Sequence, residues 1–160
     1  MDTVVVFTRK GMDTIFAQGG SGDWVANVER LDRCSYLVAT ANAHSRLTEH
    51  PESMHAHAFL VGKIAGVKDA PENPGRSIIQ LSEYAEIDIP DAWGGQRNPV
   101  RYLDLSEIGI DPAQVPWKPF PTELEETHDP IPALTIEEAK RGLSKKLGVT
   151  PESIEITIRA

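Results

Sequence analysis

The chain has 160 residues, of which 40% are hydrophobic and 25% charged, and this length and balance fit one globular domain with an appendage. Its net charge of −8 argues against a protein that coats nucleic acid regardless of sequence, because such binding depends on cations that neutralise phosphates. Cys34 is the single cysteine, so no internal disulfide can form, and a reducing compartment is favoured. The sequence contains no apolar run of about 18 residues and starts without the basic segment of a signal peptide. We therefore expect a soluble, cytoplasmic protein that makes no membrane contact.

The first forty residues alternate between strand-like and turn-like segments. Residues 3–8 are rich in β-branched side chains and predict a strand, while residues 12–17 fit a short helix or a strand equally well. Residues 18–23 predict a flexible glycine loop that leads into a strand over residues 24–28. The glycines lack the spacing of a dinucleotide-binding motif, so we do not expect the loop to cradle a phosphate. A further strand is expected over residues 33–41.

The middle of the chain carries the clearest β pattern. Apolar and polar residues alternate over 58–64, 78–81 and 100–105, as expected of strands that bury one face. A small β-barrel is therefore expected rather than a helical bundle. The loop before the last of these strands contains Trp93, two glycines and Arg97. An aromatic ring beside a guanidinium group is suited to flat, polar, π-rich ligands.

The end of the chain predicts a separate unit. Four prolines between residues 109 and 121 forbid a continuous helix or central strand, so the first domain is expected to span 1–121. Residues 122–133 are acidic and interrupted by proline, as in a linker. The unit at 134–160 is expected to contain a helix and a strand. Because it is too small to be stable alone, we expect it to dock on the barrel, on a second copy or on another protein.

The helix and strand of this unit have specific signals. Thr135 and Glu138 form a predicted capping box, and Leu134 and Ala139 are placed for a hydrophobic staple. Gly148 is placed to end the helix in the left-handed conformation. The apolar residues Ile136, Ala139, Leu143 and Leu147 share one helical face, and residues 154–158 alternate as a strand.

Four histidines gather in the polar segment between residues 42 and 57. His55 and His57 would share one face of a strand, a spacing found in metal sites, but no cysteine or metalloprotease pattern supports zinc. Three interpretations stay open: solvated loop residues, residues of a ligand pocket or acid–base catalysis, and a metal site. We expect no metal and no cofactor. The fifth histidine, His128, is expected on the surface.

Short hydrogen-bonding side chains follow the expected strand at 33–41. Asn42 and His44 could fix the edge of a base, although capping of the loop explains them equally well. Trp24 is either a core residue or a pocket wall, and Trp93 is either a ligand contact or a packed anchor. Arg97 belongs to a possible cationic patch with Lys63, Arg76 and Arg101.

Three segments resemble the PUA-like superfamily, which includes the ASCH and EVE domains. Residues 59–67 are similar to its strand of apolar residues followed by glycine, isoleucine and valine, and residues 98–105 resemble its later Pro-Val-Arg strand. Residues 22–26 resemble its Gly-Asp-x-Val segment. The resemblance spans residues 3 to about 120 and implies a pseudo-barrel with a cleft that binds RNA or modified bases in DNA.

Carried onto this chain, the resemblance implies that Trp24 and Trp93 stack on a base, that Asn42 and His44 read its edge, and that Arg97 contacts a phosphate or a base. The acidic charge and the unit at 134–160 depart from the pattern of that superfamily.

Together these observations predict an α+β protein with a mainly antiparallel, PUA-like β pseudo-barrel and a C-terminal helix–strand appendage. The expected function is a non-catalytic binding module for a nucleobase or similar planar polar ligand, in modified DNA or in RNA. One alternative is a hydrolase or nucleic-acid-processing enzyme that uses His44, His55 or His57 as acid or base. Another is a protein that binds a partner, or a second copy, through residues 134–160.

Overall fold

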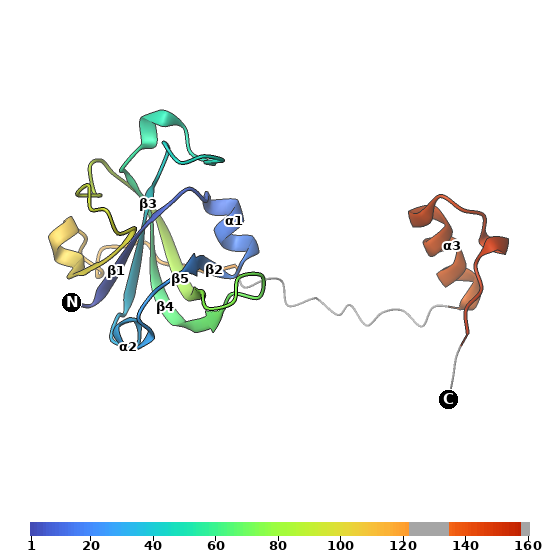
Figure 1. Ribbon diagram of the computed structural model, residues 1–160. Helices are drawn as coiled ribbons and strands as arrows, with labels where there is room; N and C mark the ends of the chain where they lie inside the picture. The colour runs from blue at the N-terminus through green and yellow to red at the C-terminus, as the bar shows by residue number, and fades with distance from the viewer. Residues whose placement is uncertain (122–134, 158–160) are drawn as a thin grey trace. The chain divides into compact units, whose positions relative to one another are not determined.

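The structure is a computed structural model that describes residues 1–121 and 135–157 (Figure 1). The chain divides into two compact units, Met1–Glu123 and Leu124–Ala160. The predicted linker at 122–133 lies outside the described residues. Each unit is described by itself.

The first unit is built mostly from strands. Its elements are β1 (Thr3–Thr8), α1 (Met12–Ala17), β2 (Gly20–Trp24), α2 (Val28–Leu31), β3 (Tyr36–Ala41), β4 (Ala58–Asp69), β5 (Ser77–Ile89), β6 (Val100–Leu103) and β7 (Lys118–Pro119), with short 3₁₀ turns at Glu52–Met54 and Leu105–Ile108. The strands predicted at 3–8, 58–64 and 78–81 are confirmed, and β4 and β5 are longer than the sequence pattern indicated. The strands predicted at 33–41 and 100–105 are confirmed over 36–41 and 100–103 only.

The strands form one mixed sheet in the order β2-β5-β4-β3-β1-β6, with β7 paired to β5. Most pairs are antiparallel, but β1 and β3 run parallel. A parallel pair needs a long crossover, and the segment that passes through α1, β2 and α2 supplies it. The expectation of a mainly antiparallel sheet is thus confirmed only in part, because alternation within strands does not reveal which strands pair.

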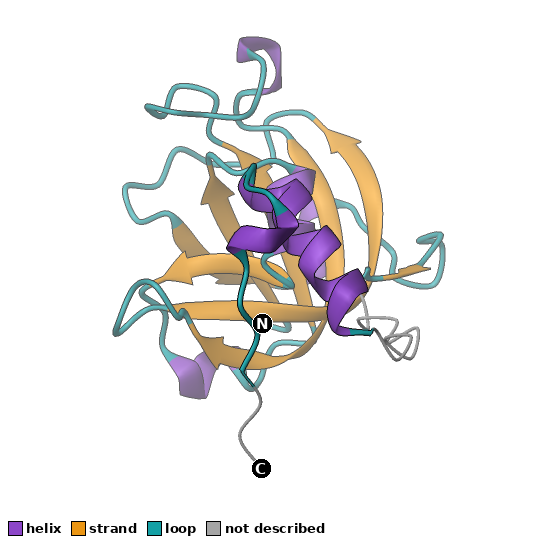
Figure 2. Cartoon of the chain, turned by 90° about the vertical axis from the view of Figure 1, so that its right-hand side faces the viewer, coloured by secondary structure: helices purple, strands orange, loops and turns teal. Residues whose placement is uncertain are grey.

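The sheet curls into a half-barrel rather than a closed barrel (Figure 2). Three register shifts interrupt the long β4–β5 pairing, between Ala58 and Leu60, between Lys63 and Ile64, and between Ile64 and Gly66. Such irregularities bend a strand and increase its twist. In this sheet β2 pairs with neither β1 nor β6, so the expected β pseudo-barrel is an open half-barrel.

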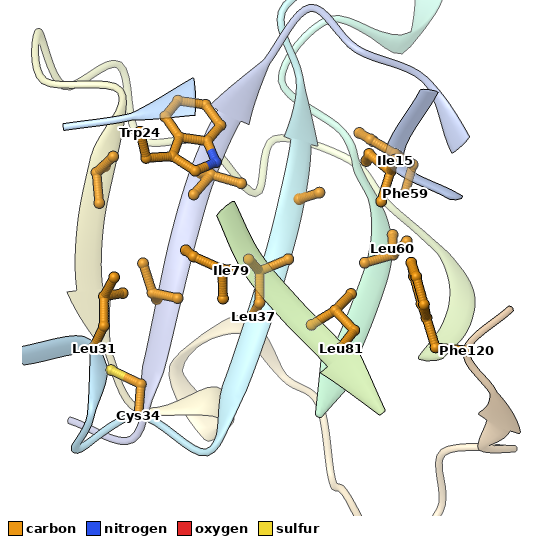
Figure 3. Close-up of a cluster of buried hydrophobic side chains, with 14 of the residues drawn as sticks. Ile15, Trp24, Leu31, Cys34, Leu37, Phe59, Leu60, Ile79, Leu81 and Phe120 are labelled. Carbon is orange, nitrogen blue, oxygen red and sulfur yellow. The ribbon is translucent and has the colours of Figure 1, made fainter. Parts of the chain in front are cut away.

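Two hydrophobic clusters lie on opposite faces of the sheet, and β1 contributes to both. Val4 and Val6 belong to the first cluster and Val5 to the second, as the alternation of side chains along a strand requires. Figure 3 shows the first cluster, with Trp24 at one end and Phe120 at the other. Its members are fully or largely buried, as are those of the second cluster, so apolar burial on both faces of the sheet stabilises this unit.

The glycine-rich segment differs most from its prediction. Residues 20–24 form β2 instead of a loop, and the strand expected at 24–28 is replaced by a turn and α2. Gly20 pairs so closely with β5 that a Cβ atom would lie 2.2 Å from the carbonyl oxygen of Ile79. Asn27 accepts a hydrogen bond from the backbone of Arg30 and caps α2, which is why the chain turns here.

The second unit contains α3 (Ile136–Leu147), which begins and ends as predicted. Thr135 and Glu138 form the capping box, and Gly148 adopts the left-handed conformation with φ of 67°. The strand expected at 154–158 is wrong over 154–157, where the chain forms no regular structure, and residue 158 is not described. A strand needs a partner strand for its backbone groups, and alternation alone does not supply one.

None of the helices within residues 1–121 and 135–157 is long and apolar enough to cross a lipid bilayer.

Candidate functional site

A polar cleft lies where the half-barrel stays open. It has a volume of about 540 Å³. Its lining comes from the end of β1 and the following turn, from β2, from the segment after β3 and from the β4–β5 hairpin. The lining residues are Phe7, Thr8, Arg9, Lys10, Gly22, Asp23, Trp24, Asn42, Ser45, Asn73, Arg76 and Pro99. The failure of the sheet to close thus leaves a concave surface between its two edges.

Asp23 joins three segments of the cleft wall. Its carboxylate accepts hydrogen bonds from Lys10 Nζ at 2.5 Å and from Asn73 Nδ2 at 2.8 Å. Its backbone carbonyl accepts one from Arg76 Nη1 at 2.7 Å. The pKa of Asp23 is lowered, chiefly because the Lys10 ammonium group donates to the carboxylate. The residue also has φ of 70°, a conformation that needs support from its surroundings.

The Lys10–Asp23 pair connects the edge strand β2 with the turn after β1. Lys10 follows β1, an inner strand between β3 and β6, whereas Asp23 belongs to β2, which lies at one end of the strand order. Only 11% of the Lys10 side chain is exposed, and its ammonium group also donates to Gln18 Oε1 at 3.0 Å. Because a buried charge is costly without a partner, this pair joins β2 to the turn after β1.

Glu49 fixes the rim of the cleft on the side of the 42–57 loop. Its carboxylate accepts from the Gly11 backbone at 2.7 Å and from the Thr14 hydroxyl at 2.8 Å. The pKa of Glu49 is lowered, mainly by the Gly11 hydrogen bond. The backbone of Glu49 also donates to the Arg9 carbonyl, and Arg9 Nη1 donates to the Leu47 carbonyl at 3.2 Å. The loop and the turn after β1 are therefore joined at several points.

Two of the five predicted ligand residues line this cleft. Trp24 is 8% exposed, belongs to the first hydrophobic cluster and donates from Nε1 to Ser21 Oγ at 3.0 Å. It is thus both a core residue and a wall of the cleft. Asn42 is half-buried, directly after β3, and its backbone donates to the Thr8 carbonyl.

Trp93 and His44 belong to a second aromatic group, which meets the cleft at Phe7, although neither Trp93 nor His44 lines the cleft. Trp93 is 7% exposed and stacks on Phe7, with 4.9 Å between ring centroids and 2° between planes. The guanidinium carbon of Arg101 lies 5.4 Å from the Trp93 ring. His55 meets the edge of Phe7, and His44 stacks on His55 with 3.6 Å between centroids. This packing leaves little of the Trp93 ring accessible to a ligand.

The other histidines make separate contacts. His57 Nδ1 lies 2.9 Å from Asp88 Oδ1, and the His50 ring lies 4.7 Å from that of Phe59. No histidine is found among the described residues that line the cleft. No group of three or more His, Cys, Asp or Glu side chains positioned to hold a metal occurs in residues 1–121 or 135–157.

The cations predicted to form one patch lie in different environments. Arg76 lines the cleft, whereas Lys63 pairs with Glu83 at 2.6 Å and Arg101 lies over Trp93. Arg97 is exposed in the loop before β6.

The sequence pattern carries no signal for Lys10 or Asn73, and it marks Asp23 only as a member of a short glycine-rich segment. Their association depends on β2 pairing with β5 at the far end of the sheet, which spacing along the chain does not reveal. The one signal that was available is the Gly-Asp-Trp segment, which places Asp23 beside Trp24.

Comparisons with protein-family models, with curated proteins and with solved structures found no match to this chain.

Proposed function

We propose that the first unit is a PUA-like binding module whose open cleft accepts a nucleobase or a similar planar polar group. The observation that carries the proposal is the cleft of about 540 Å³, which places Trp24 and Asn42 beside Arg9, Lys10 and Arg76. A pocket of this volume holds a small ligand, with a few polar groups that fix its orientation. The segments that resemble the PUA-like superfamily include Asp23 and Trp24 in β2 and the residues around β6.

In the proposed arrangement, the base lies against the part of Trp24 that reaches the cleft. Because Trp24 is only 8% exposed, this contact covers little of the indole and is not full stacking. The Asn42 side chain offers both a donor and an acceptor to its edge, as an amide does when it reads adenine. The candidate sources of the base are a free nucleoside or nucleotide, modified DNA and RNA.

The test uses a protein in which Trp93 and Trp117 are replaced by Phe, so that Trp24 is the only fluorescent indole. Nucleosides and short single-stranded oligonucleotides, with and without modified bases, are titrated into the full chain. We expect saturable quenching of Trp24, and we expect Asn42→Ala to weaken binding by ~1 kcal/mol through loss of a hydrogen bond. No quenching by any of these probes at millimolar concentration would contradict the proposal.

A second candidate function belongs to the C-terminal unit, and a different observation favours it. Ile136, Leu143 and Leu147 on α3 are 51%, 42% and 64% exposed. We propose that this apolar face associates with a second copy of the chain. Sedimentation should then show a concentration-dependent dimer that Leu143→Lys abolishes and that the neighbouring polar change Ser144→Lys preserves. A monomer at all concentrations would contradict self-association and leave a different protein as the partner.

A further inference from the structure

The cations of the cleft differ in whether they are paired with a carboxylate. The Lys10 ammonium group donates hydrogen bonds to Asp23 and Gln18, and its side chain is only 11% exposed. Arg9 and Arg76 are exposed, and each donates one hydrogen bond to a backbone carbonyl, from Leu47 and Asp23 respectively. No carboxylate of the described residues forms an ion pair with either arginine.

The cleft is therefore positive inside an acidic protein. Its lining contains Arg9, Lys10 and Arg76 against the carboxylate of Asp23, and the carboxylate of Glu49 at the rim acts on Arg9, so the positive charges exceed the negative ones by one. The whole chain has a net charge of −8. A concave surface lined by one sign of charge concentrates ligands of the opposite sign, so the cleft favours an anion where most of the surface repels one.

The two arginines come from different segments, and a hydrogen bond to a backbone carbonyl holds each of them in the cleft wall. Arg9 follows β1 and is joined to the 42–57 loop, while Arg76 belongs to the β4–β5 hairpin and is joined to β2. Each backbone carbonyl orients a guanidinium group without neutralising it. The remaining N–H groups form the planar fork that matches the oxygens of a phosphate.

We infer that the ligand of this cleft carries a phosphate group, bound by Arg9 and Arg76, so that the cleft takes a nucleotide rather than a free base or nucleoside. The inference rests on the proposed binding of a planar base at Trp24 and Asn42. A tetrahedral phosphate has enough oxygens to accept from both arginines while the base occupies the wall formed by Trp24. The phosphate belongs either to a free mononucleotide or to a nucleic acid strand, and the chemistry of recognition is the same in both.

The experiment compares ligands that differ only in phosphate, using the full chain with Trp24 as the sole tryptophan. Adenosine, guanosine, cytidine and uridine are titrated beside their 5′-monophosphates at fixed low salt. We expect each monophosphate that binds to bind about tenfold or more tightly than its nucleoside, as charge-assisted hydrogen bonds imply. A short single-stranded oligonucleotide forms the third arm. Tighter binding of the strand than of the monophosphate identifies a nucleic acid as the source, and equal binding identifies the mononucleotide.

Single variants then assign the phosphate contact. Arg9→Gln and Arg76→Gln should each weaken binding of the monophosphate about tenfold while changing nucleoside binding less than about twofold. Arg33→Gln is the matched control, because Arg33 is an exposed arginine that does not line the cleft, and it should change neither affinity. Thermal melting of each variant checks that the fold is intact.

The possible failures are distinguishable. Equal affinity for nucleoside and monophosphate would overturn the phosphate inference and leave the proposed base binding standing. A preference for the monophosphate that survives both arginine variants would overturn the assignment to Arg9 and Arg76. Absence of binding by every nucleoside, nucleotide and oligonucleotide would overturn the proposed function itself.

Discussion

Asp23 is the residue whose loss would alter the cleft most. It binds Lys10 from the turn after β1, and Asn73 and Arg76 from the β4–β5 hairpin, and does so from a left-handed backbone conformation. In the sequence it is one acidic residue in a glycine-rich segment. Its importance comes entirely from which strands lie beside it. Single residues of this kind show why the composition of a site is harder to predict than the strands that carry it.

Trp93 allows a direct test of its structural role. Trp93→Ala should lower the free energy of unfolding by ~3–5 kcal/mol, because it removes a buried ring that stacks on Phe7. Trp93→Phe keeps an aromatic ring and should cost markedly less. The third variant, Trp117→Ala, removes a tryptophan that is only half-buried and should cost less than Trp93→Ala. Urea denaturation gives the three values, and a cost below about 1 kcal/mol for Trp93→Ala would show that the ring is available for a ligand.

The lowered pKa values of His50 and His55 lead us to expect that the free energy of unfolding depends on pH. Burial lowers the pKa of His50 and of His55, and the neighbouring His44 lowers that of His55 further. As the pH falls below about 6.5, the unfolded chain takes up these protons before the folded chain does, so the free energy of unfolding decreases. The carboxylates of Asp23 and Glu49 have lowered pKa values and affect stability only at more acidic pH.

Urea denaturation at about pH 7.5 and about pH 5.5 measures this effect, because the interval covers the ordinary histidine pKa and lies above that of carboxylates. We expect lower stability at the acidic value. The variant His50→Phe should reduce the difference, since it preserves a ring against Phe59 and removes one titrating group. Equal stability of the native chain at both values would contradict the prediction.

At the scale of elements, the pairing of β2 with β5 positions one wall of the cleft. A Cβ atom on Gly20 would lie 2.2 Å from the Ile79 carbonyl oxygen, and backbone atoms cannot yield as a flexible side chain does. Gly20→Ala should therefore cost ~1–3 kcal/mol and displace β2, which carries Asp23 and Trp24. Gly66→Ala is the control, because its nearest neighbour would be Gln80 Oε1 at 3.8 Å. Similar thermal unfolding of the two variants would show that β2 is free to shift.

Local signals predicted elements well wherever the information lay within a few residues. Thr135, Glu138 and Gly148 marked both ends of α3, and β-branched residues marked β1. The prediction failed where distant pairing decides the structure. The glycines at 20–22 suggested a loop, yet β5 supplies a partner that turns them into a strand. Residues 154–157 have a strand pattern but no strand in the structure.

The candidate site was predicted only in part for the same reason. Trp24 and Asn42 were singled out and both line the cleft, whereas His44 and Trp93 lie in the aromatic group that includes Phe7. Lys10 was not identified, because its partner Asp23 belongs to β2, a strand that is distant from β1 in the order of the sheet. The proposed role of Arg97 stays a prediction.

At the scale of the whole molecule, the buried hydrophobic side chains of the described residues all lie between Val4 and Phe120. In the described part of the second unit, α3 has no buried residue. A chain that ends at residue 123 should therefore fold on its own, because it retains every side chain of that core. An unchanged melting temperature would show that the unit at 134–160 is a tethered module. Differential scanning calorimetry of both chains at matched concentration tests this, with nucleotide titration of the shorter chain to check that the cleft is intact. A melting temperature lowered by several degrees would show instead that the second unit docks on the first, since a loss of ~1 kcal/mol shifts the melting temperature of a domain this size by ~3–6 °C.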